Sequence, residues 1–166
     1  MKKQAKVLFV CMGNICRSPT GEGVFRHYVD KAGYGEKILI DSAGISDYHA
    51  GSPADQRMQQ AASRRGYALT SSARQVTVED LDYFDLIVAM DRDNLAALEQ
   101  LARGACNHIR MLGAFLDGAG NNDVARDVPD PYYGGVAGFE AVLDMIEAAC
   151  SAMLLYSLEL LQTTSK

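Results

Sequence analysis

Four short, largely apolar runs along the chain are typical of buried strands, because each is too short for a stable helix. Longer segments lie between these runs and after the last one. They carry apolar residues at helical spacing, as in Val24, Phe25, Tyr28 and Val29. The predicted strands are 6–10, 38–40, 85–89 and 109–112, and the predicted helices are 18–33, 53–65, 93–103 and 139–161.

Strands that alternate with helices predict a parallel sheet covered on both faces, a three-layer, doubly wound α/β fold. A chain of 166 residues is the usual size of one domain, so we expect residues 1–166 to form a single domain. The ligand site of such a sheet lies beyond the carboxyl ends of its strands. The segment 11–18 follows the first strand, and a long loop over 113–135 follows the last, so both are candidate site segments.

Composition and charge narrow the range of partners. The chain is 48% apolar and 22% charged, as in ordinary soluble proteins, and its net charge of −5 disfavours binding to nucleic acid or to anionic membranes. The apolar run before Cys11 is too short for a signal peptide. The longest apolar stretch, 153–161, is well short of the ~18 residues of a membrane span. We therefore expect a cytoplasmic protein without membrane or nucleic-acid partners.

The cysteines and histidines show no pattern typical of a disulfide framework or a zinc site. Without an export signal, the cysteines are expected to be free thiols. The histidines have no catalytic spacing and are expected at the surface or in satisfied contacts. We therefore predict no metal and no cofactor. The residues concerned are Cys11, Cys16, Cys106, Cys150, His27, His49 and His108.

The segment between the first strand and the first helix contains a cysteine and an arginine separated by five residues, Cys11 and Arg17. This spacing alone is weak, but its context strengthens it. A loop between a strand and a helix that starts at Ser18-Pro19 can turn its backbone N–H groups inward and bind a tetrahedral anion. Gly13 permits close approach of the backbone to a ligand, and Asn14 tolerates the left-handed conformation. The segment therefore predicts a phosphate-binding loop.

Three side chains of this loop fit nucleophilic phosphoryl transfer. Cys11 would be the nucleophile, because a helix N-terminus and a neighbouring guanidinium both stabilise a thiolate. Arg17 would hold two phosphate oxygens in a bidentate fork and follow them into the transition state. Ser18 would hydrogen-bond the sulfur as it departs. The structural alternative is that Cys11 is a small buried hydrophobe, Arg17 a surface charge and Ser18 only a cap.

The segment from Val10 to Pro19 reads VCMGNICRSP, and it resembles the signature of low-molecular-weight protein-tyrosine phosphatases residue for residue from Cys11 through Pro19. The likeness continues in family order over essentially the whole chain. The further matching segments are Asp41-Ser42-Ala43-Gly44, Ala73-Arg74-Gln75-Val76, Ala89-Met90-Asp91 and Asp130-Pro131-Tyr132-Tyr133.

The resemblance implies a four-stranded parallel sheet and metal-free hydrolysis of phosphotyrosine through a cysteinyl-phosphate intermediate. The substrate would be a tyrosine-phosphorylated protein or peptide, and the enzyme a monomer or weak dimer. The phosphate-binding loop would contribute Met12, Gly13, Asn14, Ile15, Cys16 and Ser18 to substrate binding.

Cys16 lies five residues after the nucleophile in the same loop. Our hypothesis is that it is a resolving thiol, which traps oxidised Cys11 as a disulfide. The alternative is that Cys16 only packs in the loop.

The resemblance also assigns the general acid to Asp130. Chemistry requires such an acid, because a tyrosine oxyanion with a pKa near ~10 leaves slowly without a proton donor. Composition alone leaves the choice open, since Asp127 and Asp123 lie on the same loop and Asp130 before Pro131 also suits a turn.

Aromatic residues near the motif segments are candidates for the pocket rim. The resemblance favours Tyr132 and Tyr133 as walls that hold a phenyl ring, although both would also serve as loop anchors. Tyr48 lies where relatives carry an aromatic rim residue. Ser42 corresponds to a serine that hydrogen-bonds the Asn14 side chain.

One residue departs from the family pattern, and three other functions share parts of that pattern. Ser71 lies where some relatives carry a histidine that would support the loop. An arsenate reductase of the same fold would need two further cysteines to relay a disulfide. Relatives that act on phosphoarginine carry threonine at the position of Ile15, and the apolar side chain here favours an aryl substrate. A phosphate-binding module without catalysis is the third, and it is disfavoured because nucleophile, clamp and acid are all present.

Overall fold

A single four-stranded parallel sheet forms the centre of the protein in a computed structural model that describes residues 3–116 and 121–163. The strand order is β2-β1-β3-β4, and neighbouring strands pair in parallel throughout. The predicted sheet is therefore confirmed. The strands are β1 (Ala5–Cys11), β2 (Ile38–Gly44), β3 (Leu86–Ala89) and β4 (Ile109–Met111).

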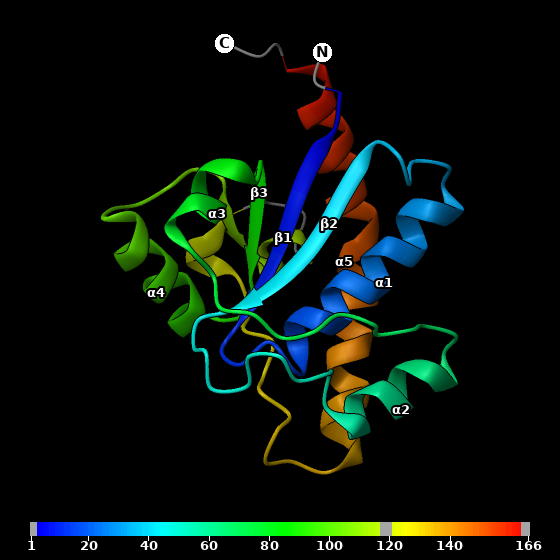
Figure 1. The fold of residues 1–166 in the computed structure, drawn as a ribbon. Helices are drawn as coiled ribbons and strands as arrows, with labels where there is room; N and C mark the ends of the chain where they lie inside the picture. The colour runs from blue at the N-terminus through cyan, green and yellow to red at the C-terminus, as the bar shows by residue number, and fades with distance from the viewer. Residues whose placement is uncertain (1–2, 117–120, 164–166) are drawn as a thin grey trace.

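Helices cover both faces of the sheet, as the doubly wound pattern predicts (Figure 1). The helices α1 (Arg17–Lys31) and α5 (Val136–Gln162) lie on one face, and α2 (Gln56–Arg64) packs against α5. The helices α3 (Val78–Tyr83) and α4 (Arg92–Ala102) lie on the other face.

The central strand β1 is buried on both sides, because successive side chains of a strand point to opposite faces. Val7 and Phe9 belong to the core beneath α1 and α5, whereas Leu8 and Val10 belong to the core beneath α3 and α4. All four side chains are completely buried. This two-sided burial explains why the strand appears in the sequence as a continuous apolar run.

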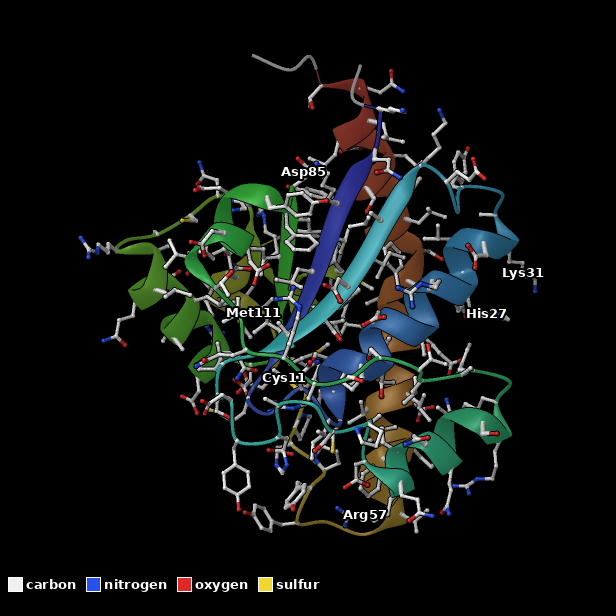
Figure 2. All side chains as sticks on the ribbon, viewed as in Figure 1. Cys11, His27, Lys31, Arg57, Asp85 and Met111 are labelled. Atoms are coloured by element: carbon white, nitrogen blue, oxygen red, sulfur yellow. The ribbon has the colours of Figure 1, made fainter. Side chains whose placement is uncertain are left out.

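The register brings the carboxyl ends of the strands to one edge. Cys11 is paired with Gly44 of β2, and Val10 is paired with Ala89 of β3. Figure 2 shows Cys11 and Met111 toward this edge and Asp85 toward the opposite end of the sheet. The loops that follow the strands therefore meet around Cys11.

One helix start was predicted wrongly, and one short helix was missed. Helix α1 begins at Arg17 with Cys16 as its N-cap residue, so Ser18 lies inside the helix and is not the cap. Helix α3 was not predicted, because its six residues are too few for a clear apolar period. It is defined instead by a capping box, in which Thr77 and Asp80 each bond the backbone of the other.

The predicted loop over 113–135 contains two 3₁₀ turns, η1 (Leu112–Phe115) and η2 (Asn122–Val124). Residues 117–120 of this loop lie outside the described part of the chain. Gly113 lies tight against the backbone of Arg126, so the two sides of the loop pack directly on one another.

The expectation that no segment approaches a membrane span also needs correction. By length and composition alone, α5 is long and apolar enough to cross a membrane. The same test is passed by core helices of soluble proteins, and α5 packs against α1, α2 and β1. Its side chains Leu143, Ile146 and Met153 are completely buried in the core.

Candidate active site

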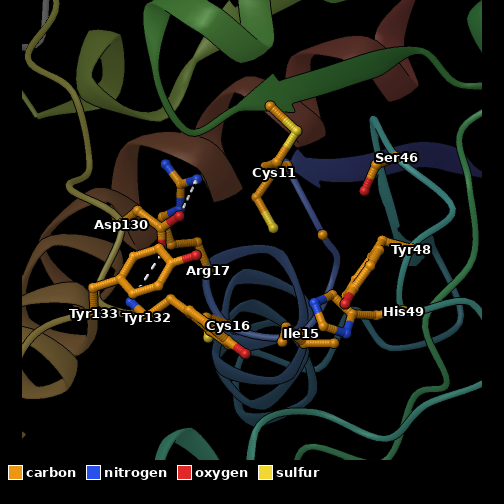
Figure 3. A pocket seen from close by; sticks show the side chains of 12 residues that line it. Cys11, Ile15, Cys16, Arg17, Ser46, Tyr48, His49, Asp130, Tyr132 and Tyr133 are labelled. Atoms are coloured by element: carbon orange, nitrogen blue, oxygen red, sulfur yellow. Dashed lines mark hydrogen bonds and ion pairs between the residues drawn. The ribbon is translucent and has the colours of Figure 1, made fainter.

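A pocket of about 390 Å³ opens at the carboxyl edge of the sheet (Figure 3). Three segments line it: the loop between β1 and α1, the segment after β2, and the loop before α5. The lining residues are Cys11, Met12, Gly13, Ile15, Cys16, Arg17, Ser46, Tyr48, His49, Asp130, Tyr132 and Tyr133.

Three carbonyl groups of the loop between β1 and α1 are bound by the segments that follow β2 and precede α2. The carbonyls of Cys11 and Met12 accept the N–H groups of Ile45 and Ser46 at 2.9 Å, and the carbonyl of Ile15 accepts the N–H of Asp55 at 2.7 Å. In a trans peptide the C=O of one residue points opposite to the N–H of the next. The N–H groups that follow these carbonyls therefore point away from the segments that bind the carbonyls, as the N–H groups of an anion-binding loop must.

Two backbone features allow the loop to be so tight. Asn14 has φ 57°, the left-handed conformation that asparagine tolerates better than most residues. Gly44 lies beneath the loop, and a Cβ there would be 3.0 Å from the backbone of Met12 and Gly13. A side chain at residue 44 would push the loop out of place.

The Asn14 side chain sets the direction of the hydrogen bonds around the sulfur. Its Oδ1 accepts the backbone N–H of Arg74 at 3.0 Å, so its Nδ2 is the donor to Ser18 Oγ at 2.7 Å. The Ser18 hydroxyl proton then remains available for Cys11 Sγ at 3.0 Å or for the carbonyl of Ala43 at 3.3 Å. The predicted Ser18–Cys11 contact is confirmed.

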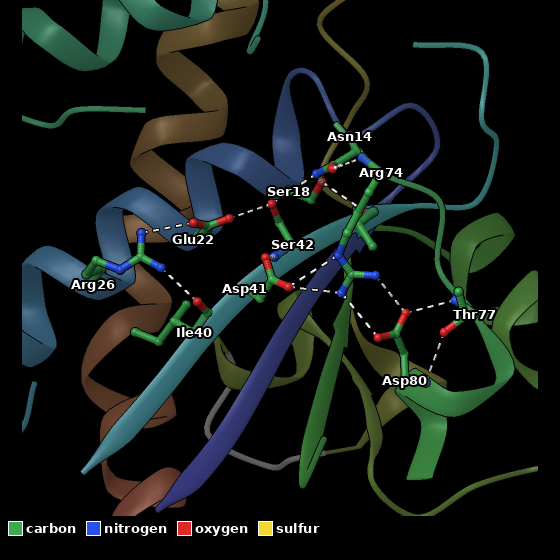
Figure 4. Close-up of polar contacts among 11 residues, drawn as sticks. Asn14, Ser18, Glu22, Arg26, Ile40, Asp41, Ser42, Arg74, Thr77 and Asp80 are labelled. Carbon is green, nitrogen blue, oxygen red and sulfur yellow. Dashed lines mark hydrogen bonds and ion pairs between the residues drawn. The ribbon is translucent and has the colours of Figure 1, made fainter. Parts of the chain in front are cut away.

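The same network continues away from the pocket (Figure 4). Asn14 Nδ2 also donates to Ser42 Oγ at 3.0 Å, as expected, and Ser42 donates in turn to Glu22 at 2.6 Å. Glu22 is buried and pairs with Arg26 at 2.9 Å. Within the described residues, Ser71 is not among the hydrogen-bond partners of Asn14.

Arg74 fixes the segment that orients Asn14. Its guanidinium pairs with Asp41 and Asp80, both at 2.9 Å (Figure 4). These two carboxylates, aided by hydrogen bonds to Arg74, raise its pKa against the opposing effect of burial. The backbone N–H that holds Asn14 is therefore itself held by charge pairs.

Arg17 is buried beneath the pocket with its guanidinium between two carboxylates. Nη1 donates to Asp91 at 2.6 Å and to the carbonyl of Val128 at 3.0 Å, and Nη2 lies 3.7 Å from Asp130. Burial opposes the charge, but Cys11 and Asp91 raise the pKa of Arg17. The side chain is thus a fixed cation next to the sulfur.

The three aspartates of the loop before α5 lie in different surroundings. Asp130 lines the pocket. The Asp127 carboxylate accepts the backbone N–H of Arg92 at 3.0 Å at the start of α4, and the backbone carbonyl of Asp123 accepts a hydrogen bond from the Arg92 guanidinium. Asp130 Oδ1 accepts the N–H of Tyr132 at 3.0 Å, so Oδ2 is the oxygen directed toward Arg17. Of the three carboxylates, Asp130 is the one that faces the pocket.

Aromatic rings form two walls of the pocket (Figure 3). Tyr48 and His49 pack edge-to-face at 4.8 Å on one side, and Tyr132 and Tyr133 pack in the same manner at 4.9 Å on the other. Tyr48 and Tyr133 are largely exposed, at 84% and 94%. The two sides approach each other where the ring centroids of His49 and Tyr132 lie 6.2 Å apart. Together these rings give the pocket an aromatic surface that suits a planar ligand ring.

Several pocket residues were not identified from the sequence. His49 lines the pocket, where its ring lies against Gly13, although it was expected outside the site, at the surface or in a satisfied contact. Asp91, which holds Arg17, follows a strand end and could have been noticed there. Ser46 and Glu22 carried no local signal, because each is brought to the site by the packing of β2 against β1 and α1.

Within the described residues, no group of three or more His, Cys, Asp or Glu side chains is placed to bind a metal ion. All four cysteines are free thiols, as expected.

Comparison with known proteins agrees with this geometry. Residues 6–165 match the profile of the low molecular weight phosphotyrosine protein phosphatase family. The Bacillus subtilis low molecular weight protein-tyrosine-phosphatase YfkJ is 46% identical over 151 residues, which are 89% of this chain and 92% of YfkJ. The human low molecular weight phosphotyrosine protein phosphatase is 39% identical over 158 residues, which are 93% of this chain and 98% of the human protein.

Solved structures agree as well. The crystal structure of YfkJ superposes with a TM-score of 0.85, 40% identity and coverage of 97% and 99% of the two chains. A Drosophila arginine phosphatase superposes with a TM-score of 0.80, 32% identity and coverage of 91% and 96%. The fold is that of a phosphatase. The chain belongs to the low molecular weight phosphotyrosine protein phosphatase family.

Proposed function

We propose that the protein hydrolyses phosphotyrosine in proteins or peptides through a phosphocysteine intermediate. The observation that carries this proposal is the convergence of Cys11, Arg17 and Asp130 on one pocket with two aromatic walls. The loop N–H groups and Arg17 bind the phosphate, and the walls hold the phenyl ring.

In the first step, Cys11 Sγ attacks phosphorus while the bond from phosphorus to the tyrosine oxygen breaks. Arg17 follows the equatorial oxygens as charge develops on them. Asp130 supplies the proton to the leaving oxygen from Oδ2, because Oδ1 already accepts an N–H. The products are a cysteinyl phosphate, a free tyrosine hydroxyl and an Asp130 carboxylate.

In the second step, water attacks the cysteinyl phosphate and Asp130 takes its proton. The bond between sulfur and phosphorus breaks, and inorganic phosphate is released. The departing thiolate receives the hydrogen bond of Ser18, whose hydroxyl oxygen already accepts a hydrogen bond from Asn14 Nδ2. Asp130 is thereby protonated again for the next turnover.

Two alternative reactions are less well supported. A disulfide relay like that of an arsenate reductase would need Cys106 and Cys150 to act together. Cys150 lies in the core beneath α1 and α5, whereas Cys106 packs against the core on the other face of the sheet. Phosphoarginine hydrolysis has support in the likeness to the Drosophila arginine phosphatase, but the apolar Ile15 lines the pocket here.

An assay with two substrates and a chelator tests the proposal. We expect kcat/KM for a phosphotyrosine peptide to exceed that for the matching phosphoarginine peptide by about 10-fold or more, since an apolar pocket discriminates by that order. Activity should be unchanged in excess EDTA, because side chains supply the nucleophile and the phosphate clamp. A preference for phosphoarginine would reassign the substrate. Loss of activity in EDTA, restored by a divalent ion, would overturn the mechanism.

Cys16 gives a prediction about oxidation. Burial raises the pKa of the Cys16 thiol to about 12, and Asp55 and Cys11 add to this effect. If peroxide converts Cys11 to a sulfenic acid, a Cys16 thiolate can attack its sulfur, so that a disulfide forms and hydroxide leaves. Because the thiolate fraction rises about tenfold per pH unit below the pKa, disulfide yield should be low at pH 6.5 and much higher at pH 9.

The measurement is the competition between disulfide formation and trapping of the sulfenic acid by dimedone at each pH. The Cys16→Ala variant should form no disulfide and should recover less activity with dithiothreitol after peroxide. Equal recovery of the variant and the parent would remove the resolving role and leave Cys16 as a packing residue.

A further inference from the structure

The start of α2 joins the two loops that build the pocket. The backbone N–H of Asp55 donates to the carbonyl of Ile15 in the phosphate-binding loop at 2.7 Å. Two residues later, Arg57 Nη2 donates to the carbonyl of Tyr132 in the loop before α5 at 3.0 Å. Figure 2 shows Arg57 beside this loop, at the end of the molecule that carries Cys11.

Arg57 is held rigidly although about half of its side chain is exposed. Its guanidinium binds the Asp55 carboxylate through two hydrogen bonds, from Nε at 3.1 Å and from Nη2 at 2.9 Å. Its planar head also lies over the rings of Tyr132 at 5.4 Å and Phe139 at 4.8 Å. A planar fork with these partners has few orientations, so Arg57 is a fixed support and not a mobile surface charge.

The peptide that Arg57 holds is one step from the proposed acid. Tyr132 accepts from Arg57 through its carbonyl and donates through its N–H to Asp130 Oδ1. A shift of the Tyr132 backbone would therefore move the Asp130 carboxyl group and change the direction of Oδ2. Within the described residues, Arg57 is the residue of α2 that hydrogen-bonds to the turn formed by Asp130 and Tyr132.

We propose that Arg57 is a positioning residue for the general acid: it holds Tyr132 so that Asp130 Oδ2 is directed at the leaving oxygen. The inference rests on the proposed function, because it requires that Asp130 is the acid. Arg57 does not line the pocket. Its loss should leave the phosphate-binding loop in place, since the bond to Ile15 comes from the backbone of Asp55.

The test compares two substrates with different needs for a proton. Arg57→Ala should lower kcat/KM for phosphotyrosine by about 10-fold, within the ~10²-fold that a displacement of 1 Å can cost. The value for nitrophenyl phosphate, whose phenolate leaves readily, should change less than about 3-fold. Arg57→Lys, which keeps the charge and the apolar stem but cannot bind Asp55 and Tyr132 through one planar fork, should show a smaller loss with the same substrate dependence.

Arg64→Ala is the matched control. Arg64 lies two turns further along α2 and also pairs with α5, through Glu140 at 3.4 Å, but it has no bond to the Tyr132 turn. Its replacement should affect both substrates equally and little. Thermal unfolding of each variant identifies any general loss of structure. If Arg57→Ala does not fold, the Arg57→Lys results stand in its place.

A double variant separates positioning from a general structural effect. If Arg57 acts through Asp130, adding Arg57→Ala to Asp130→Asn should cause no further loss on phosphotyrosine. The inference would be overturned if the double variant lost activity by the product of the two single losses. It would also be overturned if Arg57→Ala lost activity equally on both substrates. If Asp130→Asn alone shows no dependence on the leaving group, the acid assignment fails first, and the inference fails with it. If the loss depends on the leaving group for Asp130→Asn but not for Arg57→Ala, the positioning role of Arg57 is refuted and the acid assignment stands.

Discussion

The Cys11→Ser protein is expected to lose turnover by about 10⁴-fold or more, the order of loss when the nucleophile of a covalent catalyst is removed. A serine hydroxyl does not ionise at neutral pH, so the hydrogen bond from Ser18 and the nearby Arg17 charge cannot produce a comparable nucleophile. The anion site should remain, because it is built from backbone N–H groups and Arg17. The measurement is kcat/KM for phosphotyrosine together with the Kd for inorganic phosphate.

Phosphate binding within about 10-fold of the parent would show that the pocket of the Cys11→Ser variant is intact. Cys106→Ser is the control, since Cys106 packs against the core on the far face of the sheet and should be dispensable for activity. Normal turnover by purified Cys11→Ser protein would end the phosphocysteine proposal. Loss of activity in the Cys106 variant would show that a second thiol takes part.

The features of the site that could be predicted from sequence are local in the chain. A loop of fixed length between a strand and a helix is defined by its own residues, which is why the contact from Ser18 to Cys11 was predicted correctly. The left-handed conformation that Asn14 tolerates is also present. The start of α1 was misassigned because Ser18 before Pro19 has the composition of a cap. In the structure, the hydroxyl of Ser18 faces the sulfur and the asparagine instead of the helix N-terminus.

The features that could not be predicted depend on which distant segments meet. Arg57 and Tyr132 are 75 residues apart, and their contact exists because α2 and the start of α5 pack together. His49 follows an exposed tyrosine and has no spacing that indicates a site, yet the turn after β2 brings it onto Gly13. Asp91 was available in principle, because β3 was predicted correctly and a polar residue just after a parallel strand faces the ligand edge.

The choice among the aspartates of the loop before α5 also depends on contacts with distant segments and not on local sequence. Composition could not separate Asp130 from Asp127 and Asp123, and the family resemblance selected Asp130. The structure separates them by their partners. Asp127 accepts an N–H at the start of α4, Asp123 is not among the residues that line the pocket, and Asp130 lines the pocket beside Arg17.

Asp130→Asn is expected to lose activity in proportion to how much the leaving group needs a proton. The amide keeps the shape of the side chain and can still accept the N–H of Tyr132, but it has no acidic proton to give. For phosphotyrosine, whose phenol has a pKa near ~10, kcat/KM should fall by the ~10²–10⁴-fold typical of general acid catalysis. For nitrophenyl phosphate the fall should be several-fold at most, because nitrophenolate leaves without protonation.

A series of aryl phosphates provides the measurement. The logarithm of kcat/KM should depend steeply on the pKa of the leaving phenol in the variant and weakly in the parent. Asp127→Asn is the matched control: it replaces a neighbouring carboxylate of the same loop, and its slope should be that of the parent. If the steep slope belongs to Asp127→Asn instead, the acid is Asp127, and the loop must rearrange when substrate binds. If neither variant shows a steep dependence of kcat/KM on the pKa of the leaving phenol, the leaving oxygen takes its proton from water. Asp130 then serves only to hold Arg17 in place.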